Sequence, residues 1–265
     1  MGKATVGIVG SYGYVGRAMA EFFEKKYKVL LCDKDVGTLG LKDLDACDLL
    51  VICLPTPQKR DGGCETTLIE WAVRESEAEL IVIKSTIPPG TTDMLSKKYS
   101  QRIVFCPEFI GEGGYFDPHG FSTEVIQTPW FVFGGANGRR DWAEEVADFY
   151  APIAGPSKKY CITDAKTAEL VKYWNNTYFA LKVSFANEMR RVCESMGINF
   201  YEARELWAQD PRNDSAHSLA FKNSRGFGGK CLPKDLAALI SACHESNYEP
   251  KLLTAIENFN EGLKK

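Results

Sequence analysis

The sequence of 265 residues lacks the features that mark membrane, secreted and metal-binding proteins. It has no apolar run near the roughly 18 residues of a transmembrane helix and no signal-peptide layout before its first strand-like run. Its three His residues lie far apart and no two Cys residues form a CxxC pair, so no metal site is expected. The formal net charge is only -3 with both signs interspersed, which argues against nucleic acid or an anionic membrane as a partner.

Cysteine occurs nine times, an odd number, and several of these residues lie inside apolar runs rather than at paired spacings. This pattern argues against a disulfide framework and favours a reducing compartment, so we expect a soluble, cytoplasmic protein. Hydrophobic residues make up 45% and charged residues 25% of the sequence, ordinary values for a globular chain. The expected partners are therefore small molecules or a second copy of the chain.

Short apolar runs of strand length alternate with helix-like segments through the first half of the sequence. This alternation predicts βαβ units, and hence an α/β fold with a Rossmann-type, doubly wound parallel sheet. The runs cover residues 6–9, 28–32, 49–54, 80–83, 103–106 and 131–133.

A glycine-rich loop, GSYGYVG at residues 10–16, follows the first run directly and opens a helix-like segment. In dinucleotide-binding folds such glycines allow a tight turn and bring the pyrophosphate close to a helix N-terminus. The acid that ends the second run, Asp33, is placed to bind ribose hydroxyls, which favours NAD over NADP. We expect the cofactor to contact Gly10, Gly13, Tyr14, Val15, Gly16 and Asp33. The alternative is a tight strand-to-helix turn followed by a surface aspartate.

Three further loops follow strand-like runs, where the ligands of such sheets gather. Two of them are stiffened by prolines and offer the hydroxyls of Thr56 and Thr86 to cofactor or substrate. The third carries two carboxylates, Glu108 and Glu112, in a glycine-bounded segment, which makes them candidates for proton transfer. Each loop, taken alone, is also compatible with a simple strand-ending turn and solvated acids.

The second half of the sequence is expected to be helical. The segment 152–156 suggests a boundary between a cofactor domain at residues 1–156 and a helical domain at residues 157–265. Residues from about 165 to 196 contain no Gly or Pro and predict one long helix, on which Lys172 and Asn176 share a face. Because Trp174 and several other aromatic residues make this helix apolar on much of its circumference, we expect it to be sandwiched in the structure.

The segment GFGGKCLPKD, at residues 226–235, places Cys231 in a glycine-rich turn between two lysines and ahead of an amphipathic segment. Cationic neighbours and a helix N-terminus favour the thiolate form of a cysteine, and the glycines leave backbone N–H groups uncovered. This arrangement is typical of a presented nucleophile. The alternative is a buried cysteine that follows a flexible loop.

These segments together resemble the UDP-glucose/GDP-mannose dehydrogenase family. The resemblance runs through GYVG at residues 13–16, PTP at 55–57, STIPPGT at 85–91, PEFIGEG at 107–113 and the helix at 169–188, and GFGGKCLPKD is its most specific motif. The resemblance implies an NAD-dependent enzyme that oxidises the C6 alcohol of a nucleotide sugar, UDP-glucose first among them, to a carboxylate, with a role in polysaccharide biosynthesis. It also implies a homodimer formed through the second domain.

The resemblance also implies roles for individual residues. Cys231 corresponds to the family nucleophile, Lys172 and Asn176 to its oxyanion- and water-orienting pair, and Asp235 to its catalytic aspartate. Glu108 corresponds to an acid/base residue, Thr86 to a threonine that contacts cofactor and water, and Glu112 to a residue near the nicotinamide. Thr56 and Thr86 are also among the expected cofactor contacts. The expected substrate contacts are Glu108, Phe109, Ile110, Lys172, Asn176, Arg212, Phe227, Gly228 and Cys231.

The residue types fit a two-step oxidation. Loss of a proton and a hydride turns the alcohol into an aldehyde, to which the Cys231 thiolate adds; the thiohemiacetal gives up a second hydride, and water hydrolyses the thioester. Lys172 and Asn176 can stabilise oxyanions, and Asp235 or Glu108 can activate water.

Three departures accompany the resemblance. Lys230 replaces a small residue, the family's RIG reads RND after Pro211, and the region between Asp33 and Leu49 is short. The sequence ends near the helix that leads to the family's C-terminal nucleotide-binding domain. We expect that domain to be lacking, either in a fragment or in a natural short form. Two alternatives stay open: a one-step 3-hydroxyacid-type dehydrogenase with a structural Cys231, and a non-catalytic NAD-binding module.

Overall fold

The computed structural model describes residues 3–34, 38–110 and 124–264, which form two compact units. The first unit holds the described residues up to Lys172 apart from Gln58–Gly63, and the second holds Gln58–Gly63 and the residues from Tyr173 onward. The division lies within a helix, later than the boundary at residue 156 that the sequence suggested. It lies there because a seventh strand joins the sheet after residue 156, and Ala165 and Ala168 then pack into the core of the first unit.

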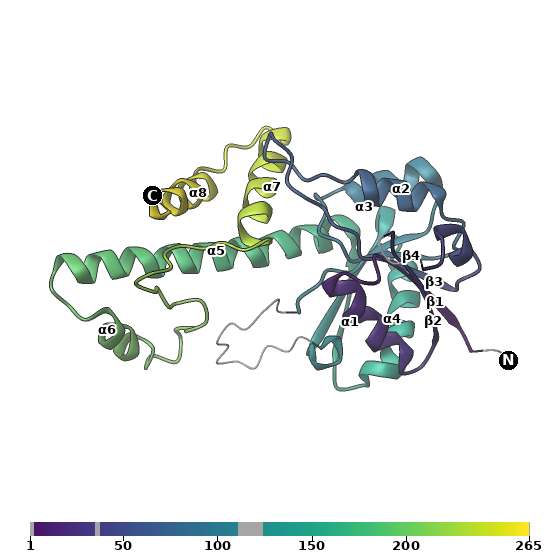
Figure 1. Cartoon of the computed structure of the whole chain (residues 1–265), viewed down its shortest axis with the longest axis horizontal. Helices are drawn as coiled ribbons and strands as arrows, with labels where there is room; N and C mark the ends of the chain where they lie inside the picture. The colour runs from purple at the N-terminus through teal and green to yellow at the C-terminus, as the bar shows by residue number, and fades with distance from the viewer. Residues whose placement is uncertain (1–2, 35–37, 111–123, 265) are drawn as a thin grey trace. The chain divides into compact units, whose positions relative to one another are not determined.

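The first unit is built on a seven-stranded sheet with the order β2-β1-β3-β4-β5-β6-β7. Figure 1 labels the strands β1 to β4 of this sheet. All neighbouring strands are parallel except β5 and β6, which are antiparallel. The α/β, Rossmann-type prediction is therefore confirmed. The strands are β1 (Thr5–Val9), β2 (Lys28–Cys32), β3 (Leu49–Ile52), β4 (Ile81–Ile83), β5 (Ile103–Phe105), β6 (Trp130–Gly135) and β7 (Lys159–Asp164).

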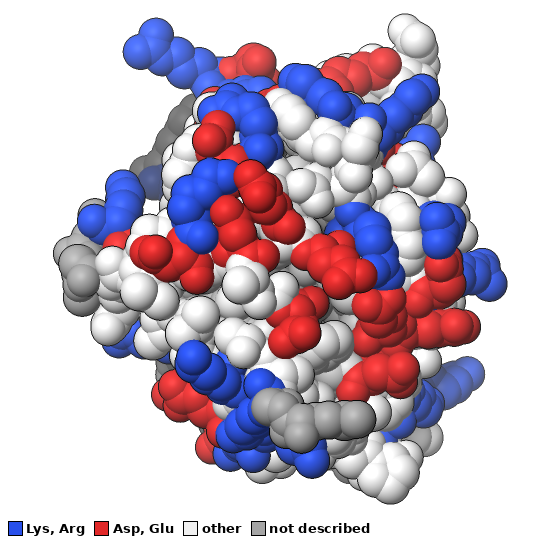
Figure 2. Space-filling view, turned by 90° about the vertical axis from the view of Figure 1, so that its right-hand side faces the viewer, with Lys and Arg blue, Asp and Glu red and all other residues white. Residues whose placement is uncertain are grey.

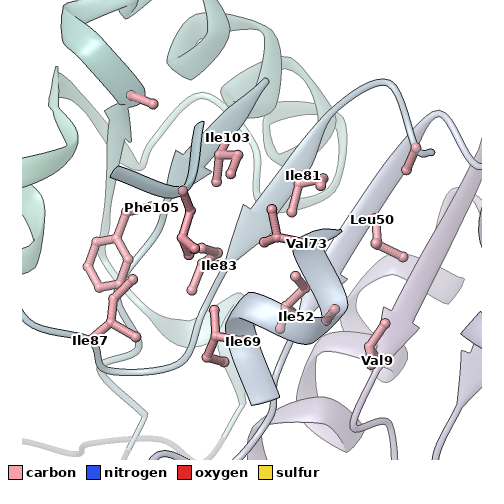
Figure 3. Packing of buried hydrophobic residues seen from close by; sticks show 14 of the residues in the cluster. Val9, Leu50, Ile52, Ile69, Val73, Ile81, Ile83, Ile87, Ile103 and Phe105 are labelled. Atoms are coloured by element: carbon pink, nitrogen blue, oxygen red, sulfur yellow. The ribbon is translucent and has the colours of Figure 1, made fainter. Parts of the chain in front are cut away.

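Helices cover both faces of this sheet, which explains why its inner strands are apolar without interruption. Successive side chains of a strand point to opposite faces, so Leu50 and Ile52 of β3 join one core cluster while Leu49 and Val51 join the other. The first cluster packs under α2, which contributes Ile69 and Val73 in Figure 3, and under α3. The second packs under α1 and α4. The helices are α1 (Tyr14–Glu24), α2 (Thr67–Glu75), α3 (Thr91–Tyr99) and α4 (Arg140–Ala154), with short 3-10 turns η1 (Leu41–Leu44), η2 (Val125–Gln127) and η3 (Ala136–Gly138).

The end of the first unit differs from the sequence-based expectation. Pro152 lies inside α4 rather than in a linker, and β7 follows where the sheet was expected to have stopped. β7 is an edge strand in which Lys159 and Cys161 are exposed. Its mixed polar and apolar residues therefore do not show the continuous apolar run that identifies the inner strands.

The second unit is helical, as predicted. The long helix α5 (Ala165–Ser195) begins in the first unit and continues into the second, where α6 (Phe200–Trp207), α7 (Leu232–Glu245) and α8 (Lys251–Leu263) follow. A small core forms between α5, α7 and α8 from Ala180, Phe227, Leu236, Ile240 and Ile256. No helix in the described ranges is long and apolar enough to cross a membrane.

The expectation that α5 is sandwiched is wrong for one of its faces. Trp174, Tyr178 and Phe185 are 67%, 47% and 57% exposed. They belong to a stripe on α5 that the described residues of this chain do not cover, whereas Tyr173 and Ala180 are fully buried. The apolar circumference of α5 therefore exceeds what the described part of the chain buries.

Charged side chains of both signs lie beside one another over the face drawn in Figure 2. Figure 2 thus matches the interspersed charge of the sequence, whose formal net charge is -3.

Candidate functional site

The glycine loop between β1 and α1 forms the tight turn that its sequence predicts. The N–H of Gly10 donates to the Cys32 carbonyl at 2.9 Å, and Gly10 has a φ of +79°, which favours glycine. A Cβ at Gly16 would lie 2.1 Å from the Gly10 carbonyl oxygen. Among the described residues no side chain caps α1 at Gly13, so the loop resembles the cradle that holds a pyrophosphate at a helix N-terminus.

Asp33 lies beside this loop at the end of β2. Its Oδ2 accepts a hydrogen bond from the Tyr12 N–H at 3.0 Å, and the Thr38 hydroxyl accepts from the Asp33 N–H at 2.6 Å. Loop and carboxylate are therefore adjacent, as binding of a pyrophosphate and its neighbouring ribose requires.

The loops that follow β3 and β4 are tied to each other. The Thr56 hydroxyl donates to the Thr86 carbonyl at 2.8 Å, and the Ser85 hydroxyl donates to the Leu54 carbonyl at 2.7 Å. Thr56 is buried, so its hydroxyl helps to fix the Thr86 loop.

Glu108 is held by a buried lysine that the sequence analysis did not select. Glu108 Oε1 accepts from the N–H groups of Phe109 and Ile110, both at 2.7 Å, and Oε2 lies 3.2 Å from Lys84 Nζ. That ion pair lacks hydrogen-bond geometry, since Oε2 receives no hydrogen bond from the described residues. Burial lowers the pKa of Lys84, but Cys106 and the Glu108 carboxylate more than compensate, so the pKa lies above its ordinary value. Lys84 is therefore a cation that neutralises Glu108.

Lys172 meets the same loop from α5. Its ammonium group donates to the Glu108 carbonyl at 2.5 Å and lies 5.5 Å from the Phe109 ring centroid. The first unit thus brings Glu108, Phe109 and Lys172 together, while Ile110 packs against the second core cluster. Glu112 lies outside the described residues.

Glu169, one turn before Lys172, was also missed. It is fully buried and accepts hydrogen bonds from the Gly90 N–H at 2.5 Å, the Thr92 N–H at 2.8 Å and the Thr92 hydroxyl at 2.5 Å. Burial raises the pKa of Glu169 to about 7, although these donors oppose the rise. Glu169 therefore joins the start of α5 to the N-terminus of α3, directly after the Thr86 loop. The only hint of Glu169 in the sequence was its spacing, because an acid three residues before Lys172 lies one helical turn from it.

In the second unit Asp235 is the centre of a buried polar group. Its Oδ2 accepts from Asn176 Nδ2 at 2.5 Å, and its Oδ1 accepts from Lys234 Nζ at 2.5 Å. Asp235 is 1% exposed and Asn176 6% exposed. The structure thus pairs the two predicted residues Asn176 and Asp235 and adds Lys234 to them.

Cys231 stands at the N-cap position of α7 and is exposed. Its carbonyl accepts from the Asp235 N–H at 2.9 Å, which is the first turn of the helix. Of the nine cysteines, all within the described ranges, only Cys161 shares this exposure. By contrast, burial raises the pKa of Cys47 to about 11, so that thiol stays protonated at neutral pH.

The remaining expected substrate contacts are more scattered. Phe227 is buried in the core of the second unit. Gly228 is exposed in the cysteine loop, which we define as residues 226–230 ahead of Cys231. The Arg212 side chain is 86% exposed and pairs with Asp210 at 2.6 Å within its own loop. Among the described residues, no group of His, Cys, Asp and Glu side chains could hold a metal ion.

Two domain models of one protein family match this chain. The NAD binding domain of the UDP-glucose/GDP-mannose dehydrogenase family matches residues 36–154, and the central domain of that family matches residues 166–262. The chain belongs to the UDP-glucose/GDP-mannose dehydrogenase family. NAD is the cofactor of its first domain, and the glycine loop beside Asp33 fits this cofactor.

Relatives within this dehydrogenase family act on different sugars. UDP-glucose 6-dehydrogenase AglM of Haloferax volcanii is 31% identical over 251 residues, which are 87% of this chain and 56% of that protein. UDP-N-acetyl-D-mannosamine dehydrogenase of Methanocaldococcus jannaschii is 30% identical over 231 residues, 83% of this chain and 49% of that protein. The chain spans about half the length of the curated relatives it matches.

The solved structures of two dehydrogenases share the fold. A UDP-glucose dehydrogenase from Pyrobaculum islandicum matches with a TM-score of 0.85 at 25% identity, over 98% of this chain and 68% of that chain. The 3-hydroxyisobutyrate dehydrogenase of Mycobacterium tuberculosis matches with a TM-score of 0.73 at 15% identity, over 97% of this chain and 92% of that chain. The second likeness concerns the fold alone.

Proposed function

We propose that this chain carries the cofactor and catalytic residues of an NAD-dependent nucleotide-sugar 6-dehydrogenase, with UDP-glucose first among its substrates. The observation that carries the proposal is the exposed Cys231 at the start of α7, one turn before Asp235, in a chain that belongs to this dehydrogenase family. The proposed reaction oxidises the C6 alcohol to a carboxylate and takes place in the cytoplasm.

The proposed chemistry has two oxidation steps. The glycine loop and Asp33 would hold NAD+, which would supply the hydride acceptor, with a fresh NAD+ needed for the second step. Cys231 Sγ adds to the aldehyde carbon that the first oxidation creates, and the resulting thiohemiacetal loses its hydride to become a thioester. Water then attacks the thioester carbon, and Cys231 leaves as the thiolate. For each sugar, two NAD+ and one water yield the acid, two NADH and two protons, in addition to the proton that the acid releases.

The chain's own polar groups have separate proposed tasks. The Lys172 ammonium and the Asn176 amide stabilise the oxyanions that form at C6. Asp235 accepts from Asn176 and Lys234, and its remaining lone pairs can orient the hydrolytic water. Glu108, whose charge Lys84 balances at 3.2 Å, can accept the alcohol proton through water. Thr86 and Glu112 are proposed to contact the cofactor and the water.

The proposal is tested with a panel of nucleotide sugars, in which NADH formation is followed by absorbance. We expect turnover of at least one sugar and complete loss of acid product in Cys231→Ser. Cys161→Ser, which alters the other exposed cysteine, should keep the full rate. NAD binding in calorimetry without turnover of any sugar would instead identify a non-catalytic module. A Cys231→Ser chain with undiminished rate would indicate a one-step dehydrogenase of the 3-hydroxyacid type.

We also propose that two copies of the chain form a dimer through α5. Trp174 and Phe185 are eleven residues apart, as are Tyr178 and Met189, and eleven residues are close to three helical turns. These four side chains therefore form one stripe, and each is at least 38% exposed in the single chain. A second copy offers an identical stripe, so a two-fold arrangement would cover both.

A further inference from the structure

The glycine-rich loop ahead of Cys231 is held by a residue far along the chain, Asn260 in α8. Asn260 Oδ1 accepts a hydrogen bond from the Phe227 N–H at 2.7 Å, and Asn260 Nδ2 donates to the Phe227 carbonyl at 3.0 Å. One side-chain amide thus binds both backbone polar groups of a single residue. Asn260 is 3% exposed, so both hydrogen bonds form away from water.

The local sequence is fitted to this contact. Asn260 shares the buried face of α8 with Ile256, and a polar group on such a face is unfavourable unless it has a partner. Gly226, immediately before Phe227, has a φ of +74°, and a Cβ there would lie 2.4 Å from Asn260 Oδ1. Gly226 therefore permits the approach of the amide, and any other residue at this position would block it.

The anchor lies just before the exposed part of the loop. The Phe227 side chain is buried against Leu236 and Ile256, so this residue is fixed through its ring and its backbone. The next three residues are exposed, and Cys231 then begins α7, where its carbonyl accepts from the Asp235 N–H at 2.9 Å. Cys231 is thus held by α7 on one side and, across three exposed residues, by the Asn260 anchor on the other.

We infer that Asn260 is a positioning residue for the cysteine loop. Its two hydrogen bonds fix the point at which the loop leaves the core, and thereby fix where the Cys231 thiol lies at the start of α7. The effect on turnover rests on the proposed function. The effect on the loop does not, because it follows from the geometry of the second unit alone.

The test replaces Asn260 with Leu, which keeps the bulk and removes both hydrogen bonds. We expect the protection of the Phe227 amide against hydrogen exchange to fall at least about tenfold. The rate of Cys231 alkylation by iodoacetamide should change, and kcat should fall about 10- to 100-fold with the KM for NAD unchanged. Thr254→Val is the matched control on α8, because the Thr254 hydroxyl has no hydrogen-bond partner among the described residues. Thr254→Val should leave the Phe227 protection, the rate of Cys231 alkylation, kcat and the KM for NAD unchanged.

Asn260→Asp provides a rescue that a general loss of packing would not give. Its carboxylate still accepts from the Phe227 N–H but faces the Phe227 carbonyl without a proton to donate, whereas the protonated acid can form both hydrogen bonds. Relative to the unaltered chain at each pH, protection and turnover should therefore be low at neutral pH and recover on acidification. This variant also decides the question if Asn260→Leu does not fold.

Two results separate this inference from the proposed function. Phe227 protection and Cys231 alkylation in Asn260→Leu that equal those of Thr254→Val would overturn the inference, even in an active chain. Absence of turnover in the unaltered chain would overturn the proposed function, and the exchange and alkylation measurements would still decide the role of Asn260.

Discussion

At the scale of single residues, Glu169 shows how burial and hydrogen bonding oppose each other. Its carboxyl group is fully buried and accepts hydrogen bonds from Gly90 and Thr92. These donors favour the charged form, but burial outweighs them and raises the pKa of Glu169 from 4.5 to about 7. The folded chain therefore holds this proton over a pH range in which the unfolded chain has lost it.

This difference predicts a pH-dependent contribution to stability. As the pH rises through 4.5 the unfolded state ionises, while the folded state stays protonated until about pH 7. The contribution of Glu169 to the free energy of unfolding should thus fall by about 3 kcal/mol between these values and stay constant above them. Glu169→Gln cannot titrate, so the stability of the unaltered chain relative to this variant should fall as the pH rises. Urea denaturation from pH 4.5 to 8 measures the free energy of unfolding of both chains. If the unaltered chain minus the variant gives a value that is constant or rises with pH, the pKa of Glu169 is not raised in the folded chain.

The residues that the sequence analysis could and could not find differ in where their partners lie. Cys231 and Asp235 lie within one turn of each other and form a local motif, so their side-chain chemistry was readable from the sequence alone. Glu169 binds Gly90, and Asn260 binds Phe227, across 79 and 33 residues. Such partners are known only after the chain has folded.

At the scale of elements, the first turn of α1 depends on close packing against the loop before it. Gly16 lies within α1, where alanine would ordinarily be favoured over glycine by about 1 kcal/mol. A Cβ there would lie 2.1 Å from the Gly10 carbonyl oxygen, a separation that requires the backbone to move. Steric exclusion should therefore outweigh helix propensity at this position.

We expect Gly16→Ala to lower the free energy of unfolding by about 1–3 kcal/mol and to weaken NAD binding. Gly262→Ala in α8 is the matched control, because among the described residues no atom outside the adjoining turns of α8 lies within 4 Å of a Cβ there. It should be neutral or stabilising by less than about 1 kcal/mol. Thermal denaturation and calorimetric titration with NAD provide the comparison. Equal effects of the two substitutions would show that the close approach at Gly16 has no energetic consequence.

Helices and strands were predictable where the sequence pattern typical of one kind of element continued without interruption. The inner strands and α5 are apolar runs or long uninterrupted helical segments, and the structure has them where they were expected. β7 was missed because an edge strand exposes alternate residues, and the segment 152–156 was interpreted as a boundary although Pro152 lies inside α4. The expected boundary at residue 156 followed from these two interpretations.

At the scale of the whole molecule, the described residues leave an apolar stripe on α5 uncovered. If a second copy covers it, a negative charge in its middle should separate the copies, because an unpaired buried charge is costly. We expect a dimer in sedimentation velocity for the unaltered chain and a monomer for Phe185→Glu. Leu252→Glu, at a position in α8 that is 63% exposed, is the control and should remain dimeric. A Phe185→Glu chain that stays dimeric would place the interface elsewhere.

Two successive oxidations by one chain are best tested by the ratio of NADH formed to sugar consumed. The measurement is made at saturating nucleotide sugar and NAD, so that neither concentration limits the rate. Sugar loss and acid formation are quantified by mass spectrometry in the same samples. We expect two NADH for each sugar converted to acid, and no acid from Cys231→Ser. One NADH per sugar, at a rate that does not depend on Cys231, would show instead that the chain carries out a single oxidation without a cysteine nucleophile.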